Sequence, residues 1–150
     1  MKVRLDLDDQ IHEPEIIIRA ASNDPNVKRW QQILENLSQE DAIACYQGET
    51  EYFLKLDQIL FIETADRRLQ IHTSDNIYMS KKHLYELADR LPGYFLQISK
   101  SALVNLYQIN ALNKSISTCL ISFHNSHKQV YASRRYYKQL QERLNEMRSL

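Results

Sequence analysis

The chain begins with two stretches in which apolar positions follow a strand-like pattern. Val3, Leu5 and Leu7 alternate with polar residues, and an isoleucine run lies within Glu15–Arg19. The cap-forming sequence Ser22-Asn23-Asp24-Pro25 follows, and apolar residues then recur at helical spacing: Val27, Trp30, Ile33, Leu34 and Leu37. Residues 1–40 are therefore predicted to form a small strand-strand-helix segment.

The pattern becomes mainly β after the polar junction Ser38–Asp41. Short β-type runs are Ala44–Tyr46, Glu51–Leu56, Gln58–Glu63, Arg68–His72, Asn76–Met79, Tyr94–Ile98, Leu103–Ala111, Cys119–Phe123 and Gln129–Ala132. Two amphipathic helices are expected, one from about Lys81 with Ser80 as its cap and one after Ser133. We predict one mainly β domain with short helices over residues 41–150.

Composition places the chain among globular proteins. It has 150 residues, 43% hydrophobic and 25% charged, which is enough for one domain with a real core. No apolar run approaches the roughly 20 residues of a membrane span, and the first residues lack a signal-peptide core, so we expect a cytoplasmic location. Cys45 and Cys119 are too few for a disulfide framework and fit small core residues.

Charge and glycine content narrow the function further. The formal net charge is zero, but the first fifty residues carry 5 basic and 10 acidic residues and the last fifty carry 7 and 2. This asymmetry hints at a C-terminal part that meets a polyanion. Two glycines, Gly48 and Gly93, exclude glycine-rich phosphate loops, so we expect no nucleotide cofactor.

Basic clusters stand at the predicted ends of elements. They are Asp66-Arg67-Arg68, Lys81-Lys82, Ser99-Lys100-Ser101, and Ser133-Arg134-Arg135 followed by Lys138. Arginine and lysine beside hydroxyls can grip phosphates and reach guanine edges in the major groove. The alternative interpretation is that these residues only mark solvated turns.

The pair His124 and His127 is the one other candidate for chemistry. Its spacing suits neither a strand face nor a zincin helix, and no second cysteine or carboxylate stands nearby to complete a metal site. A polar turn between two strands is the better interpretation.

Four ordered segments resemble the LytTR DNA-binding domains of bacterial transcription regulators. They are Asp57–Thr64, Leu84–Pro92, Phe95–Asn105 and His127–Lys138, within a match from about Gln47 to Leu144. The resemblance implies an elongated β fold of about ten strands in small sheets, whose loops enter successive major grooves.

The resemblance also implies site residues. Bases are expected to meet Arg67 or Arg68, Lys100 and Arg135, while Lys82, Ser101, Arg134, Ser133 and Lys138 suit phosphates. Forty residues before the module are too few for the receiver domain that usually precedes it, so we expect no receiver domain here. The resemblance extends to stand-alone members with a short leader, and it implies control by a partner, often a small membrane protein made beside them.

Three hypotheses from different classes follow. The first is a regulator without enzymatic activity that acts as a homodimer on repeated promoter sites in double-stranded DNA, with no cofactor, metal or small-molecule substrate. The second is a protein-interaction module that inhibits a related regulator and binds DNA poorly, which the zero net charge and the acidic first third support. The third is a small hydrolase or metal enzyme built on His124 and His127. For residues 1–40, dimerisation, sensing of a partner and simple packing all remain open.

Overall fold

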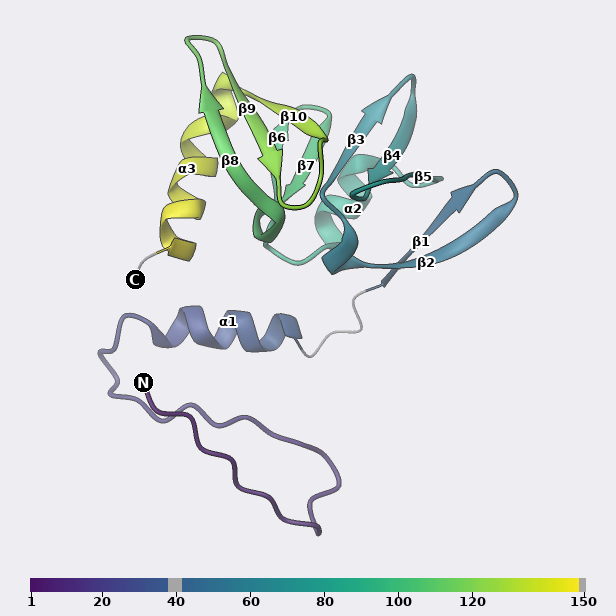
Figure 1. Ribbon diagram of the computed structural model, residues 1–150. Coiled ribbons are helices and arrows are strands. Elements are labelled where there is room, and N and C mark those ends of the chain that lie inside the picture. Colours follow the sequence, from purple (N-terminus) through teal and green to yellow (C-terminus); the bar gives the residue numbers. More distant parts are fainter. Residues whose placement is uncertain (38–41, 149–150) are drawn as a thin grey trace. The chain divides into compact units, whose positions relative to one another are not determined.

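A computed structural model describes residues 1–37 and 42–148, and the fold is mainly β (Figure 1). Contacts divide the chain into unit 1, Met1–Glu40, and unit 2, Asp41–Leu150. The predicted junction Ser38–Asp41 lies outside the described residues. Of the described helices, none is long and apolar enough to cross a membrane.

The described residues of unit 1 contain one helix, as the periodicity predicts. Helix α1 spans Val27–Leu37, and the side-chain carboxylate of Asp24 accepts a hydrogen bond from the Asn26 N–H at 2.9 Å just before it. Asp24 therefore satisfies one of the free N–H groups at the start of the helix.

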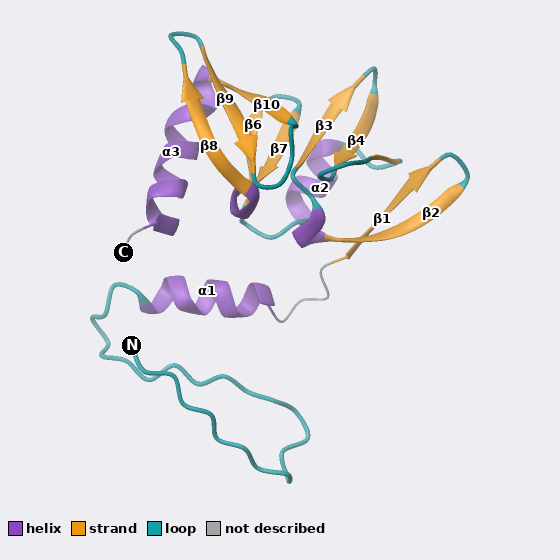
Figure 2. Cartoon of the chain, in the orientation of Figure 1, coloured by secondary structure: helices purple, strands orange, loops and turns teal. Residues whose placement is uncertain are grey.

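The prediction of two strands within residues 1–20 is wrong. These residues form turns and extended chain, drawn as loop in Figure 2. Val3, Leu5 and Leu7 are 81%, 85% and 87% exposed. A strand needs a hydrogen-bonded neighbour, and the apolar alternation alone does not provide one.

Unit 2 is built on a seven-stranded antiparallel sheet in the order β2-β1-β5-β4-β3-β7-β6. Its strands are β1 (Ala42–Gln47), β2 (Thr50–Lys55), β3 (Phe61–Ala65), β4 (Arg68–His72), β5 (Ile77–Ser80), β6 (Phe95–Ser99) and β7 (Ala102–Asn105). Short 3-10 helices, Leu56–Gln58 and Leu106–Gln108, precede β3 and β8, and helix α2 (Leu84–Arg90) connects β5 to β6. The ten-strand fold predicted for residues 41–150 is confirmed.

A second sheet, in the order β10-β9-β8, completes unit 2. It consists of β8 (Ile109–Lys114), β9 (Thr118–Phe123) and β10 (Gln129–Ser133), and helix α3 (Arg134–Arg148) follows it. The buried Leu140 and Leu144 of α3 pack in one hydrophobic cluster with β6, β7 and this sheet. A separate hydrophobic cluster contains buried residues of β1 to β4, together with Leu87 of α2, Phe95 of β6 and Leu103 of β7. Cys45 and Cys119 are buried in these clusters, as predicted, and burial raises the pKa of both thiols.

Two sequence predictions within unit 2 need correction. The run Leu103–Ala111 is two strands, because the buried Asn105 side chain accepts a hydrogen bond from Tyr107 N and starts a 3-10 turn. Ser80 does not cap α2: its hydroxyl accepts from Lys82 N, and the helix begins after His83, whose N–H donates to the carboxylate of Glu86.

Candidate nucleic-acid interface

The β3–β4 turn defines one end of the seven-stranded sheet. Ala65 and Arg68 face each other across β3 and β4, so Asp66 and Arg67 form a two-residue turn. Both turn residues have left-handed backbones, with φ of 51° and 63°. This geometry suits a hairpin, but an arginine there costs about 1–2 kcal/mol relative to a right-handed conformation. Backbone strain of this kind is often found at functional sites.

The β6–β7 turn lies at the same end. Strand β3 pairs with β7 so that Glu63 faces Ala102, and Thr64 N donates to Ser101 O at 2.8 Å. Ser99 Oγ accepts from Ser101 N at 3.2 Å, which leaves Lys100 at the tip of the turn. The predicted residues Arg67, Lys100 and Ser101 therefore come from neighbouring turns.

Lys82 also belongs to this end of the sheet. Ser80, the last residue of β5, faces Leu69 at the start of β4, so the chain leaves β5 near the β3–β4 turn. Lys82 follows two residues later, half-buried, and its neighbour Lys81 places Nζ 4.8 Å from the centre of the Tyr46 ring.

The start of helix α3 supplies the fourth basic segment. Strand β10 ends at Ser133, and Arg134 and Arg135 are the first residues of α3. Lys138 is four residues after Arg134, which places both on one helical face. Figure 1 shows the β3–β4 turn, the β6–β7 turn and the start of α3 at the upper end of unit 2.

The electrostatics of this end favour an anionic ligand. Asp66 is the only acidic residue within residues 66–68, 81–82, 99–101 and 133–138. Among described residues, no ion pair, hydrogen bond or ring contact engages the side-chain cations of Arg67, Arg68, Lys100, Arg134, Arg135 and Lys138. All six are exposed, so each can meet a phosphate or a base edge without first breaking an intramolecular bond.

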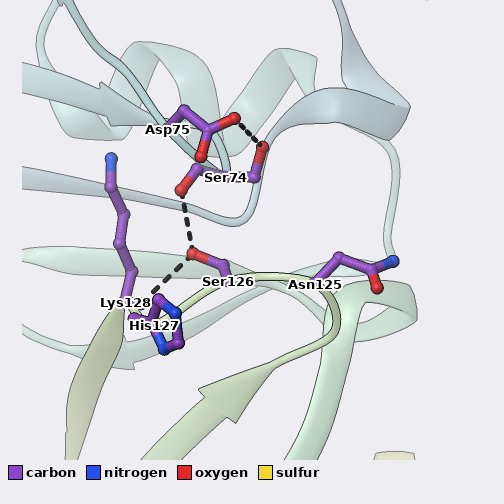
Figure 3. A pocket seen from close by; sticks show the side chains of 6 residues that line it. All are labelled: Ser74, Asp75, Asn125, Ser126, His127 and Lys128. Atoms are coloured by element: carbon purple, nitrogen blue, oxygen red, sulfur yellow. Dashed lines mark hydrogen bonds between the residues drawn. The ribbon is translucent and has the colours of Figure 1, made fainter.

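A pocket of about 650 Å³ lies at the opposite end of β4 (Figure 3). It is lined by Ser74, Asp75, Asn125, Ser126, His127 and Lys128, from the β4–β5 and β9–β10 turns. The Ser126 hydroxyl donates to Ser74 O at 2.9 Å, and Lys128 Nζ donates to Asn76 O at 2.6 Å. These bonds tie the two sheets together.

His72 contacts Lys128, which lines this pocket, and its pKa is shifted. Burial, together with the nearby charge of Lys128, lowers the pKa of His72 from 6.5 to about 4. A neutral ring fits both contacts, because Nε2–H can donate to Glu63 Oε1 at 3.0 Å while Nδ1 accepts from Lys128 Nζ at 3.4 Å. Burial also lowers the pKa of Lys128, which the charge of Asp75 opposes. Neutral His72 and charged Lys128 thus act as structural partners.

Sequence patterns predict the turn at His124–His127 but not this pocket. The turn between β9 and β10 is confirmed, with Asn125 in a left-handed backbone at φ 55°. Ser74 and Ser126 are 52 residues apart, and neither belongs to a recognisable motif. No local signal could have brought them together.

Comparison with known proteins identifies related sequences and folds. Residues 49–145, more than half of the chain, match the LytTr DNA-binding domain family. An uncharacterized HTH-type transcriptional regulator of Staphylococcus aureus strain NCTC 8325 is 27% identical over 145 residues, 97% of this chain and 99% of the relative, and one from strain COL has the same values. A solved LytTr DNA-binding domain from Bacillus cereus shares the fold, with a TM-score of 0.64 and 20% identity over 69% of this chain and 96% of that one.

Proposed function

We propose, from the premise that this chain belongs to the LytTr DNA-binding domain family, that it is a transcription regulator which binds repeated promoter sites in double-stranded DNA. The observation that carries the proposal is the set of exposed, unpaired cations that the β3–β4 turn, the β6–β7 turn and the start of α3 bring to one end of unit 2, with the half-buried Lys82 nearby. The two relatives named as transcriptional regulators match this chain over nearly their whole length, and their names support the same role.

Turns, rather than a recognition helix, are the elements that read the DNA in this proposal. Between α2 and α3 lie the five strands β6 to β10, so these two helices do not form a helix-turn-helix pair. Arg67 and Lys100 lie in turns and Arg135 lies in the first turn of α3, and all three side chains have the reach for guanine O6 and N7. Arg68 is exposed next to the turn, on the strand face opposite the buried Leu69, and is the alternative first reader.

Phosphate contacts fall to the residues that flank these tips. Lys82, Ser101, Arg134, Ser133 and Lys138 carry hydroxyls or cations beside the proposed readers. Such contacts set register and orientation on the duplex and do not depend on sequence.

The proposal includes a homodimer in the cytoplasm without enzymatic activity. Residues 1–40 are the proposed dimer contact, because the apolar face of α1 is incompletely covered: Val27, Trp30 and Leu34 are half-buried and Ile33 is exposed. Control by a membrane protein stays a prediction. An inhibitor that pairs with a related regulator is the second candidate, favoured by the zero net charge and the acidic first third.

Salt dependence tests the DNA-binding proposal directly. With roughly four to six phosphate contacts, the slope of log affinity against log salt concentration is expected to be about −4 to −5, because bound phosphates release counterions. Mobility-shift titrations of a duplex from the promoter of the chain's own gene, at several salt concentrations, measure it. A random duplex of equal length is the control. A salt-insensitive complex, or equal affinity for both duplexes, contradicts the proposal and favours the inhibitor.

Replacement of Arg67 by glycine separates DNA reading from folding. Arg67→Gly creates an Asp-Gly hairpin turn and removes the left-handed strain, so the free energy of unfolding should rise by about 1 kcal/mol. Affinity for the promoter duplex should nevertheless fall roughly tenfold, since a base contact is lost. Urea unfolding and a binding titration on the same variant measure both.

Asn125→Gly is the matched control for this variant. Asn125 also has a positive φ but lies in the β9–β10 turn at the pocket end. It should leave DNA affinity unchanged. If Arg67→Gly binds as well as the natural chain while Arg68→Ala does not, then Arg68 is the reader.

A further inference from the structure

Strand β2 is an open edge of the seven-stranded sheet. It pairs with β1 on one side, and no described strand pairs with its other side. Tyr52 and Phe53 in this strand are exposed, Phe53 by 74%. An open edge presents backbone N–H and C=O groups to any extended chain that can pair with it. This edge runs along the side of the sheet, so a strand added there leaves the end that carries the basic turns free.

The segment Glu15–Arg19 of unit 1 has the properties of a missing strand. It consists of three consecutive β-branched residues between opposite charges. Ile16 and Ile17 are 69% and 63% exposed, and no described strand pairs with the segment. Exposure of this much apolar surface in an extended chain points to a partner that covers it.

The sequences of this segment and β2 are complementary in one antiparallel register. When Glu15 is set against Lys55, Arg19 falls against Glu51, so an opposite-charge pair closes each end. In a parallel register Glu15 would face Glu51, and like charges directly opposite each other are unfavourable. The charges therefore select the antiparallel direction.

The same register also matches the two faces of the sheet. Leu54 and Tyr52 lie on the core face, where their partners in β1 are the buried Ile43 and Cys45. Ile16 and Ile18 fall against them and would extend this apolar face. Ile17 falls against the exposed Phe53 on the other face, where an aromatic and a β-branched side chain form a favourable cross-strand pair.

We infer that residues 15–19 of one copy add as an antiparallel strand to β2 of a second copy, and that the exchange is reciprocal. A two-fold dimer made in this way contains the strand pair twice, since each copy gives one segment and receives one. The inference rests on the proposed function for its choice of a second copy, because a repeated site requires two reading domains held together. According to this inference, residues 15–19 have a strand-like sequence because they form a strand in the dimer.

Charge reversals test the register. Arg19→Glu and Glu51→Arg each create two like-charge pairs in the dimer and should weaken self-association about tenfold in sedimentation velocity. The double variant Arg19→Glu/Glu51→Arg should dimerise as the natural chain does. Arg4→Glu is the matched control: it reverses an exposed arginine in the same unit, outside the register, and should change nothing.

Mixing the two single variants distinguishes a second copy from the same chain. In a mixed dimer, the glutamate introduced at position 19 of one copy meets the arginine introduced at position 51 of the other. The second strand pair of that dimer keeps the natural Arg19 against the natural Glu51. Mixing should therefore restore dimerisation. If the double variant recovers but the mixture does not, the strand adds within one chain and the inference is overturned.

Other outcomes also overturn it. A natural chain that is monomeric at tens of micromolar contains no such dimer, and single variants that dimerise normally place the contact elsewhere. Affinity of each variant for a single half-site is measured in parallel and should be unchanged. If the natural chain does not bind a half-site, the proposed function is contradicted, but the result on self-association still stands.

Discussion

A chain truncated to begin at Gln39 is expected to bind the full repeated site at least a hundredfold more weakly than the full-length chain, yet to recognise one half-site equally well. Both hydrophobic clusters and all four basic segments lie in unit 2, so the truncated chain keeps its core and its proposed readers. The truncated chain lacks residues 1–40, the proposed contact that holds two copies together. A second binding event on linked sites gains typically 10²–10⁴ in effective strength, and the truncated chain forfeits this gain.

Sedimentation and duplexes with one or two half-sites measure this effect. The truncated chain should be monomeric and should bind both duplexes with similar affinity per site. If it dimerises as well as the full-length chain, residues 1–40 are not the dimer contact. Insoluble truncated protein would assign these residues a role in folding instead.

Alanine at each of the three proposed readers should reduce affinity and also relax specificity. Arg67→Ala, Lys100→Ala and Arg135→Ala each remove a contact to a base edge and are expected to cost roughly 1–3 kcal/mol on the cognate site, with discrimination lost at particular base pairs. The three changes act on exposed side chains, so stability should remain within about 0.5 kcal/mol.

Lys82→Ala is the contrasting variant. As a phosphate contact it should weaken all duplexes to a similar extent and reduce the salt slope by about one, without altering the preferred sequence. Competition titrations with single-base variants of the site measure discrimination for all four proteins. If the three reader variants keep full discrimination, the division between base and phosphate contacts is wrong.

Local patterns are sufficient to predict most of unit 2. The sequence predicts a strand at Arg68–His72, for example, and β4 occurs there, because Leu69 and Ile71 are buried two residues apart and a tight turn precedes the strand. The split of Leu103–Ala111 is not predictable, since it depends on the Asn105 amide, which donates to Leu56 O and Ile59 O far back in the chain. Buried polar residues act through partners that periodicity does not reveal.

For residues 1–20 the sequence predicts strands that do not form. Their alternation resembles that of real strands, but strand formation requires a neighbouring edge, and none is present within the described part of unit 1. The basic clusters can be located from the sequence because they flank turns. Their gathering at one end cannot, because it depends on the registers of β3 with β7 and of β4 with β5.

The shortness of the basic turns affects how fast the protein can engage DNA. Asp66 and Arg67 close a two-residue hairpin, and the β6–β7 turn is fixed to β3 through the bond from Thr64 N to Ser101 O. Backbone already held in this way loses little conformational entropy on binding. Association should then resemble the docking of a rigid body, with a rate set by electrostatic encounter and not by the ordering of loops.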